Sequence, residues 1–142
     1  MAKTGTISHI SLSTSDYEQS KKFYNFLLVD LLGYKKTVEH PYYTMWVLSS
    51  GEAICVSPGN TTPHHKTNPG LHHLAFNAET PELIDEMYQK IVQFQEANKA
   101  ITASVILDKP ALYPQYGPGY YAVFFTDVDG IKLEIASVPD HA

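Results

Sequence analysis

Two histidines and one glutamate stand out because each lies in a short segment that alternates like a β-strand. His9, His73 and Glu134 all point away from the apolar side of their segments. The apolar residues that alternate with them are Ile10, Leu12, Leu74, Phe76, Leu133 and Ile135. A carboxylate between two apolar neighbours needs a polar partner if it is buried. Two imidazoles and a carboxylate form a 2-His-1-carboxylate metal site, which leaves coordination positions open for substrate or water.

The elements that would position these residues occur twice in the chain. Each half predicts a strand, a helix and three further strands. The strands are expected near 7–13, 34–39, 42–49 and 52–57, and again near 72–78, 101–106, 120–126 and 131–137. Overlaying Gly51 on Gly130 places Cys55 on Glu134, each four residues after its glycine. The sequence therefore predicts an α+β fold of two paired βαβββ modules within one domain, 1–142. Module 1 covers about 1–58, a linker about 58–70, and module 2 about 71–142.

Capping signals and apolar spacing predict the two helices. Ser15 with Glu18 has the form of a capping box, and Thr80 followed by Pro81 is typical of a helix start. Helical spacing then relates two sets of apolar residues, Phe23, Leu27 and Leu31 in the first half and Ile84, Met87, Tyr88 and Ile91 in the second. Gly33 is expected to end the first helix, and the sequence 127–130 to form a tight turn before the last strand.

Composition excludes several classes of protein. The 142 residues carry a net charge of −5, and all ten basic residues are Lys. The chain thus lacks the basic patch that nucleic acid requires. Its single Cys excludes an internal disulfide framework. We expect no nucleic-acid or membrane partner, since no apolar run approaches the roughly 18 residues of a membrane span. The N-terminus opens without an apolar signal stretch, which favours a cytoplasmic protein.

Three segments resemble the vicinal oxygen chelate superfamily, which includes glyoxalase I, bleomycin-resistance proteins, fosfomycin-resistance enzymes and extradiol dioxygenases. The segments are 9–16 (HISLSTSD), 70–76 (GLHHLAF) and 127–134 (DVDGIKLE). The resemblance covers nearly the whole chain. It implies paired βαβββ modules that form a cupped mixed sheet around a divalent metal (zinc, iron, manganese or nickel), and a homodimer. It also implies ligands from the first and last strands of each module, which are His9, Cys55, His73 and Glu134.

Each ligand has a structural alternative. Glyoxalase I-like members usually have a carboxylate where Cys55 stands, whereas other members use three protein ligands. Cys55 could bind zinc as a thiolate, but a small buried apolar residue is the favoured interpretation. His73 is preferred to His72, which the alternation directs to the other face. Glu134 could instead serve in a cross-strand ion pair.

Tyrosines are the second notable feature of the sequence. Four of the ten lie between 113 and 121, in or directly after a loop rich in Pro and Gly that is expected over 109–119. Tyr116, Tyr120 and Tyr121 are candidate acid/base residues. Ser11, Trp46 and Tyr113 are candidate substrate-binding residues, since aromatic walls suit a small oxygenated ligand. The alternative is packing at a cleft edge or a subunit interface.

The preferred hypothesis is a divalent-metal-dependent enzyme of lyase, isomerase or dioxygenase type that acts on a small oxygenated molecule chelating the metal. Glutathione-dependent chemistry is disfavoured, because it normally uses Arg to hold two carboxylates. A second hypothesis is a metal-free ligand-sequestering protein of the bleomycin-resistance type, with which the negative net charge is compatible. A non-catalytic subunit or interaction domain is a third.

Overall fold

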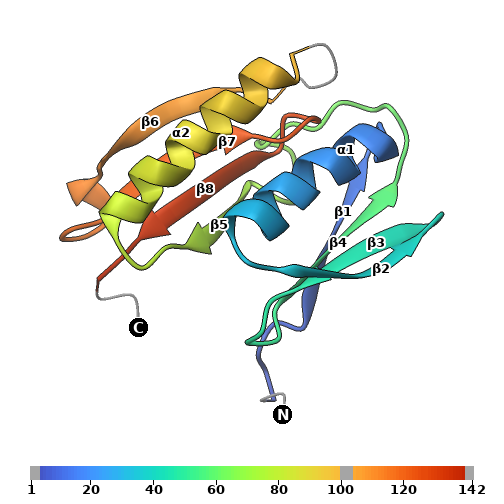
Figure 1. Ribbon diagram of the computed structural model, residues 1–142, viewed down its shortest axis with the longest axis horizontal. Coiled ribbons are helices and arrows are strands. Elements are labelled where there is room, and N and C mark those ends of the chain that lie inside the picture. Colours follow the sequence, from blue (N-terminus) through green and yellow to red (C-terminus); the bar gives the residue numbers. More distant parts are fainter. Residues whose placement is uncertain (1–3, 100–103, 140–142) are drawn as a thin grey trace. The chain divides into compact units, whose positions relative to one another are not determined.

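The computed structural model describes residues 4–99 and 104–139 (Figure 1). The chain divides into two units, unit 1 ending at Thr62 and unit 2 beginning at Pro63. Each unit has the predicted order of one strand, a helix and three strands. The α+β fold class and the two βαβββ modules are therefore confirmed. No helix within the described residues has the length and apolar character needed to cross a bilayer.

Unit 1 contains a four-stranded mixed sheet in the order β1-β4-β3-β2. Its strands are β1 (His9–Thr14), β2 (Lys35–His40), β3 (Tyr43–Val47) and β4 (Ala53–Pro58). β1 and β4 are parallel, and the other pairs are antiparallel. Helix α1 (Tyr17–Tyr24) continues into a π-helical segment η1 (Asn25–Leu31). Gly33 follows with a φ of +78°, which ends the helix as predicted.

Unit 2 repeats this plan with the strand order β5-β8-β7-β6. Its strands are β5 (His73–Asn77), β6 (Ile106–Leu112), β7 (Tyr121–Thr126) and β8 (Lys132–Ser137). Helix α2 (Pro81–Ala97) packs against β6, β7 and β8 on one face of this sheet (Figure 1). A short 3-10 helix, η2 (Pro114–Tyr116), lies between β6 and β7.

The core of each unit lies between its sheet and its helix. The largest fully buried side chains are Phe23, Tyr24, Leu27, Leu28, Trp46 and Val56 in unit 1, and Ile84, Ile91, Val123, Phe125, Leu133 and Ile135 in unit 2. Leu12 and Phe76 are also buried, whereas the His9 side of β1 is exposed. This agrees with the alternation that the sequence predicted for the first strand of each module.

The second module departs from prediction at its second strand. β6 runs over Ile106–Leu112, so that part of the expected 109–119 loop belongs to a strand. Residues 100–103, which include the start of the predicted 101–106 strand, lie outside the described part of the chain. β6 tolerates Pro110 because it is the edge strand and its pairing with β7 shifts register between Asp108 and Ala111. A proline at an edge or bulge removes no ladder hydrogen bond that the sheet needs.

The two helix caps differ in how well the sequence predicted them. Thr80 Oγ1 accepts a hydrogen bond from the Leu83 N–H at 3.2 Å, which confirms the predicted cap of α2. The predicted cap at Ser15 is wrong, because Asp16 Oδ1 accepts from the Gln19 N–H at 3.1 Å. The residue that caps is the last one with extended backbone, and Asp16 has a φ of −137° and a ψ of 97°.

The Asp16 cap leads to a testable expectation for stability. Asp16→Ala should lower the free energy of unfolding by about 1 kcal/mol, because one of the first N–H groups of α1 loses its acceptor. Asp16→Asn keeps an acceptor oxygen and should stay within a few tenths of the wild type. Urea unfolding followed by circular dichroism measures both variants. Equal stability of the alanine and asparagine variants would contradict the cap.

Candidate functional site

The first and last strands of unit 2 bring two predicted site residues together. β5 and β8 are parallel neighbours, with His73 opposite Lys132 and Ala75 opposite Glu134. Residues opposite each other in a sheet present their side chains to the same face. The tight turn before β8 was predicted and is present: the Gly130 N–H donates to the Asp127 carbonyl at 3.2 Å. The side chain of Asp127, which is 1% exposed, accepts from the Asp129 and Ile131 N–H groups at 2.9 Å each. This turn fixes the start of β8 and hence the position of Glu134.

Glu134 is a buried carboxylate with both oxygens occupied. It is 2% exposed. Its Oε1 lies 3.2 Å from His73 Nε2, and its Oε2 accepts a hydrogen bond from the Tyr120 hydroxyl. Burial of the Tyr120 phenol and its hydrogen bond to this carboxylate raise the pKa of Tyr120 well above its usual range. A buried charge requires such partners. The structure therefore joins His73, Glu134 and Tyr120, all of which the sequence singled out.

His72 corrects one expectation. The sequence predicted that it points away from His73, yet the two Nδ1 atoms lie 2.7 Å apart and the rings meet edge-on at 5.0 Å. β5 begins at His73, so the alternation of a strand does not apply to the residue before it. Burial is the main cause that lowers the pKa of His72, and the charges of His73, Lys132 and Lys66 lower it further. Nonetheless His73, and not His72, faces Glu134.

Aromatic side chains form a wall beside Glu134. Tyr113 stacks on Tyr116 with ring centroids 5.6 Å apart and meets Phe124 edge-on at 5.4 Å. Tyr116 in turn meets Tyr120 at 5.4 Å. Tyr113 and Tyr120 pack against a buried cluster that includes Phe124, and Phe124 is the β7 residue opposite Glu134. The aromatic wall, defined as Tyr113, Tyr116, Tyr120 and Phe124, thus borders the His73–Glu134 pair.

Tyr121 lies on the other face of the same sheet. It precedes Ala122, whose register partner Ala136 shares the face of Glu134. The Tyr121 hydroxyl donates to Asp85 Oδ1 of α2 at 2.6 Å, and this bond raises the pKa of Tyr121 to about 12. Of the three candidate acid/base tyrosines, the structure brings Tyr116 and Tyr120 to the Glu134 face and places Tyr121 on the helix side.

Unit 1 gathers its own candidate residues in a pocket of about 310 Å³. The lining residues are His9, Ser11, Tyr42, Tyr43, Met45, Cys55 and Ser57. Ser11 is opposite Cys55 in the β1–β4 register, and Met45 is opposite Cys55 in the β3–β4 register. The Cys55 thiol is free and 6% exposed. His9 Nδ1 lies 3.1 Å from the Ser8 hydroxyl. The predicted ligands of module 1 and the predicted substrate residue Ser11 therefore share one face.

Trp46 does not line this pocket. Its side chain is fully buried and lies beside the Tyr24 ring of α1, with centroids 6.4 Å apart. Its indole N–H donates to Asn25 Oδ1 at 3.3 Å. Because Trp46 lies opposite Ile54 and not Cys55, it is on the helix side of the unit 1 sheet. The structure separates this predicted substrate-binding residue from His9 and Ser11.

The donor set of unit 2 fits a divalent metal. An imidazole nitrogen and a carboxylate oxygen 3.2 Å apart have the separation expected of two ligands that each bind one ion at about 2.0–2.2 Å. Bonds from His72 to His73 and from Tyr120 to Glu134 orient the two donors, as outer-shell partners of metal ligands do. Within residues 4–99 and 104–139, no three His, Cys, Asp or Glu side chains form a metal-binding group.

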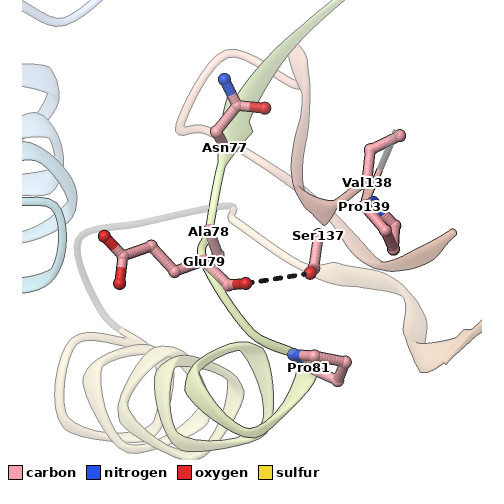
Figure 2. A pocket seen from close by; sticks show the side chains of 7 residues that line it. All are labelled: Asn77, Ala78, Glu79, Pro81, Ser137, Val138 and Pro139. Carbon is pink, nitrogen blue, oxygen red and sulfur yellow. Dashed lines mark hydrogen bonds between the residues drawn. The ribbon is translucent and has the colours of Figure 1, made fainter. Parts of the chain in front are cut away.

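A further pocket of unit 2, of about 450 Å³, lies where β5 meets α2 and β8 ends (Figure 2). It is lined by Asn77, Ala78, Glu79, Pro81, Ser137, Val138 and Pro139. Ser137 Oγ donates to the Glu79 carbonyl at 3.5 Å, and the Glu79 carboxylate points away from Ser137 (Figure 2). Among the described residues that line this pocket, none is a predicted site residue. We therefore place the candidate site at Glu134.

Sequence reasoning missed two residues on the Glu134 face. Lys132 lies two residues before Glu134 on β8, and its ammonium lies 4.6 Å from the centre of the Phe124 ring. The strand alternation that selected Glu134 also places Lys132 on the Glu134 face of β8. The sequence could therefore have identified Lys132. Phe124 could not be distinguished in the same way, because every residue of Ala122–Phe125 is apolar.

Comparison with known proteins agrees with this architecture. Residues 6–135 match the model of the Glyoxalase/Bleomycin resistance protein/Dioxygenase superfamily. The chain is 30% identical over 132 residues to the uncharacterized protein YqjT of Bacillus subtilis, covering 91% of this chain and 96% of that protein. It is also similar to the crystal structure of a Bacillus halodurans protein, with a TM-score of 0.76, 26% identity and coverage of 95% of this chain and 97% of the other.

A second solved structure supports the fold alone. The glyoxylase/bleomycin resistance protein/dioxygenase domain from Frankia sp. EAN1pec superposes with a TM-score of 0.71 at 22% identity, covering 95% of this chain and 98% of that one. The family match spans both units and includes His9, Cys55, His73 and Glu134. The chain belongs to the Glyoxalase/Bleomycin resistance protein/Dioxygenase superfamily.

Proposed function

We propose that this protein is a divalent-metal-dependent enzyme of lyase, isomerase or dioxygenase type that acts on a small oxygenated molecule. The observation that carries the proposal is the buried Glu134 carboxylate 3.2 Å from His73 Nε2. A carboxylate buried between Leu133 and Ile135 is costly unless its site has a use for the charge. A divalent cation would supply that use.

The proposed ligands are His73 and Glu134 from unit 2 and His9 from unit 1. The position of His9 supports this role. His9 lies on the first strand of module 1, and His73 lies on the first strand of module 2. Cys55 corresponds to Glu134 in the module overlay and is the candidate fourth ligand. Its burial against Met45 and Ser11 agrees equally with a small apolar side chain.

The surrounding residues support the proposed chemistry. A bound metal polarises a chelating substrate oxygen and stabilises the resulting anion. The Tyr120 hydroxyl holds one Glu134 oxygen, which leaves the other directed at His73. His72 fixes the orientation of the His73 ring through the Nδ1 contact. The aromatic wall lies beside the pair, where it would contact the apolar part of a bound substrate.

Metal analysis of the purified protein tests the proposal. We expect elemental analysis to find about one divalent ion per chain in protein loaded with zinc, iron, manganese or nickel and then dialysed. His73→Ala should lose most of it, because an imidazole ligand is removed. His65→Ala, which changes an exposed histidine outside the site, is the matched control. No metal retained by the wild type under any of the four loadings would refute the metal-dependent function.

The aromatic wall favours a second candidate function, metal-free binding of a small ligand as in bleomycin-resistance proteins. Four aromatic rings, each in contact with at least one other, present an apolar surface with hydroxyl groups at its edge. A thermal-shift screen of metal-stripped protein separates the two candidates. Stabilisation by divalent metal supports the enzyme, and stabilisation by aromatic ligands without any response to metal supports the binding protein.

A further inference from the structure

Lys132 is a cation on the Glu134 face that the proposed metal site does not use. It lies opposite His73 across the β5–β8 pair and two positions before Glu134 on β8, about 6.6 Å between backbone positions. Its ammonium lies 4.6 Å from the centre of the Phe124 ring. The charge is thus held at the aromatic wall by the face of a buried ring.

The charge of Lys132 is not needed to balance Glu134. Both Glu134 oxygens already have partners, His73 and Tyr120. Among the residues that the structure describes, no acidic side chain forms an ion pair with Lys132. A ring face satisfies none of the three N–H donors of an ammonium group in the way that an anionic oxygen does. These donors therefore remain available to a ligand.

Lys132 is not the only lysine near this face, because the charges of both Lys132 and Lys66 act on His72. Lysine charges beside a site raise the local concentration of anions, even though the chain as a whole has a net charge of −5.

We propose that Lys132 anchors a carboxylate of the substrate, and that the substrate is therefore a small organic acid with an apolar or aromatic body. This rests on the proposed function, because the metal at His73 and Glu134 would hold the reacting oxygens while Lys132 holds the acid group. The aromatic wall contacts the apolar body. Lys132 determines specificity, and it neither binds the metal nor takes part in proton transfer.

Two probes of the same shape test the charge recognition. Salicylate carries a carboxylate beside a hydroxyl, and salicylamide replaces that carboxylate with a neutral amide. Isothermal titration calorimetry measures both probes on the wild type and on Lys132→Met, each metal-free and zinc-loaded. We expect the wild type to prefer salicylate and Lys132→Met to lose about tenfold in salicylate affinity, with little change for salicylamide. The metal's own preference for the carboxylate is the same in both proteins and cancels in the comparison.

Control variants exclude general effects of charge or folding. Lys132→Arg keeps a cation and should retain the preference for salicylate, whereas Lys90→Met removes an exposed lysine of α2 and should behave as the wild type. Unchanged discrimination in Lys132→Met, or no saturable salicylate binding by the wild type at millimolar concentration, would overturn the proposal. Zinc titrated alone into the wild type separates the two hypotheses. Failure of zinc to bind refutes the metal site, and the metal-free titrations then still decide the role of Lys132.

Discussion

Glu134→Gln is expected to lower the affinity for a divalent metal by about a hundredfold or more. Loss of outer-shell partners alone typically costs about 10–100-fold, and here the proposed charged ligand itself would be removed. Glutamine has nearly the same volume, and its carbonyl oxygen can still accept the Tyr120 hydrogen bond. The change thus isolates the negative charge from the packing around it.

Calorimetric titration of metal-free protein with zinc measures this effect. Glu86→Gln, on the exposed side of α2, removes one negative charge away from the site and is the matched control. We expect the control to bind as the wild type does. Urea unfolding of metal-free Glu134→Gln checks that the fold survives. Equal zinc affinity of Glu134→Gln and the wild type would show that Glu134 is not a ligand and would leave it as the ion-pair partner of His73.

Trp46→Ala is expected to destabilise the protein by about 3–5 kcal/mol, the usual cost of truncating a fully buried Trp. Trp46 is 0% exposed and packs beside Tyr24 in the core of unit 1. The loss is a large part of the roughly 5–15 kcal/mol by which domains are stable. Trp46→Phe keeps most of the volume but loses the bond to Asn25, and should cost less.

This prediction separates two roles for Trp46, core packing and ligand binding. Urea unfolding followed by far-ultraviolet circular dichroism suits the test, because the substitution removes the chain's one Trp fluorophore. Tyr42→Ala is the control, since Tyr42 is 75% exposed and lines the His9 pocket; its stability should remain within about 0.5 kcal/mol of the wild type. A stable Trp46→Ala variant with weakened ligand binding would restore the substrate-contact role.

The strand faces of several candidate site residues could be predicted because their signals are local. The alternation in β1 and β5 identified which side of each strand carries His9 and His73, and the turn before β8 located Glu134. The same pattern failed for Trp46, because its neighbours Met45 and Val47 are also apolar and a uniformly apolar strand does not reveal its faces. It failed for His72 because that residue precedes the strand.

The tyrosines show the same limit. Tyr120 and Tyr121 are adjacent in sequence, and both are large amphipathic side chains. The start of β7 at Tyr121 sends the Tyr121 hydroxyl to Asp85 on α2, whereas the Tyr120 hydroxyl reaches Glu134. Partners 36 and 14 residues away decide these roles. Lys132 was missed for a different reason. The sequence already shows that Lys132 and Glu134 share one face of their strand, but the position of Lys132 over Phe124 depends on the pairing of β7 with β8.

The sequence by itself determined the repeated βαβββ order, the family resemblance and the strand faces of His9, His73 and Glu134, because periodicity and turns depend on residues close along the chain. Tertiary structure alone decided which partners these side chains meet: His72 beside His73, Tyr120 on Glu134, Lys132 over Phe124 and Trp46 beneath α1. Such contacts depend on strand register and on how each helix covers its sheet, and both are set by packing between residues far apart in the chain.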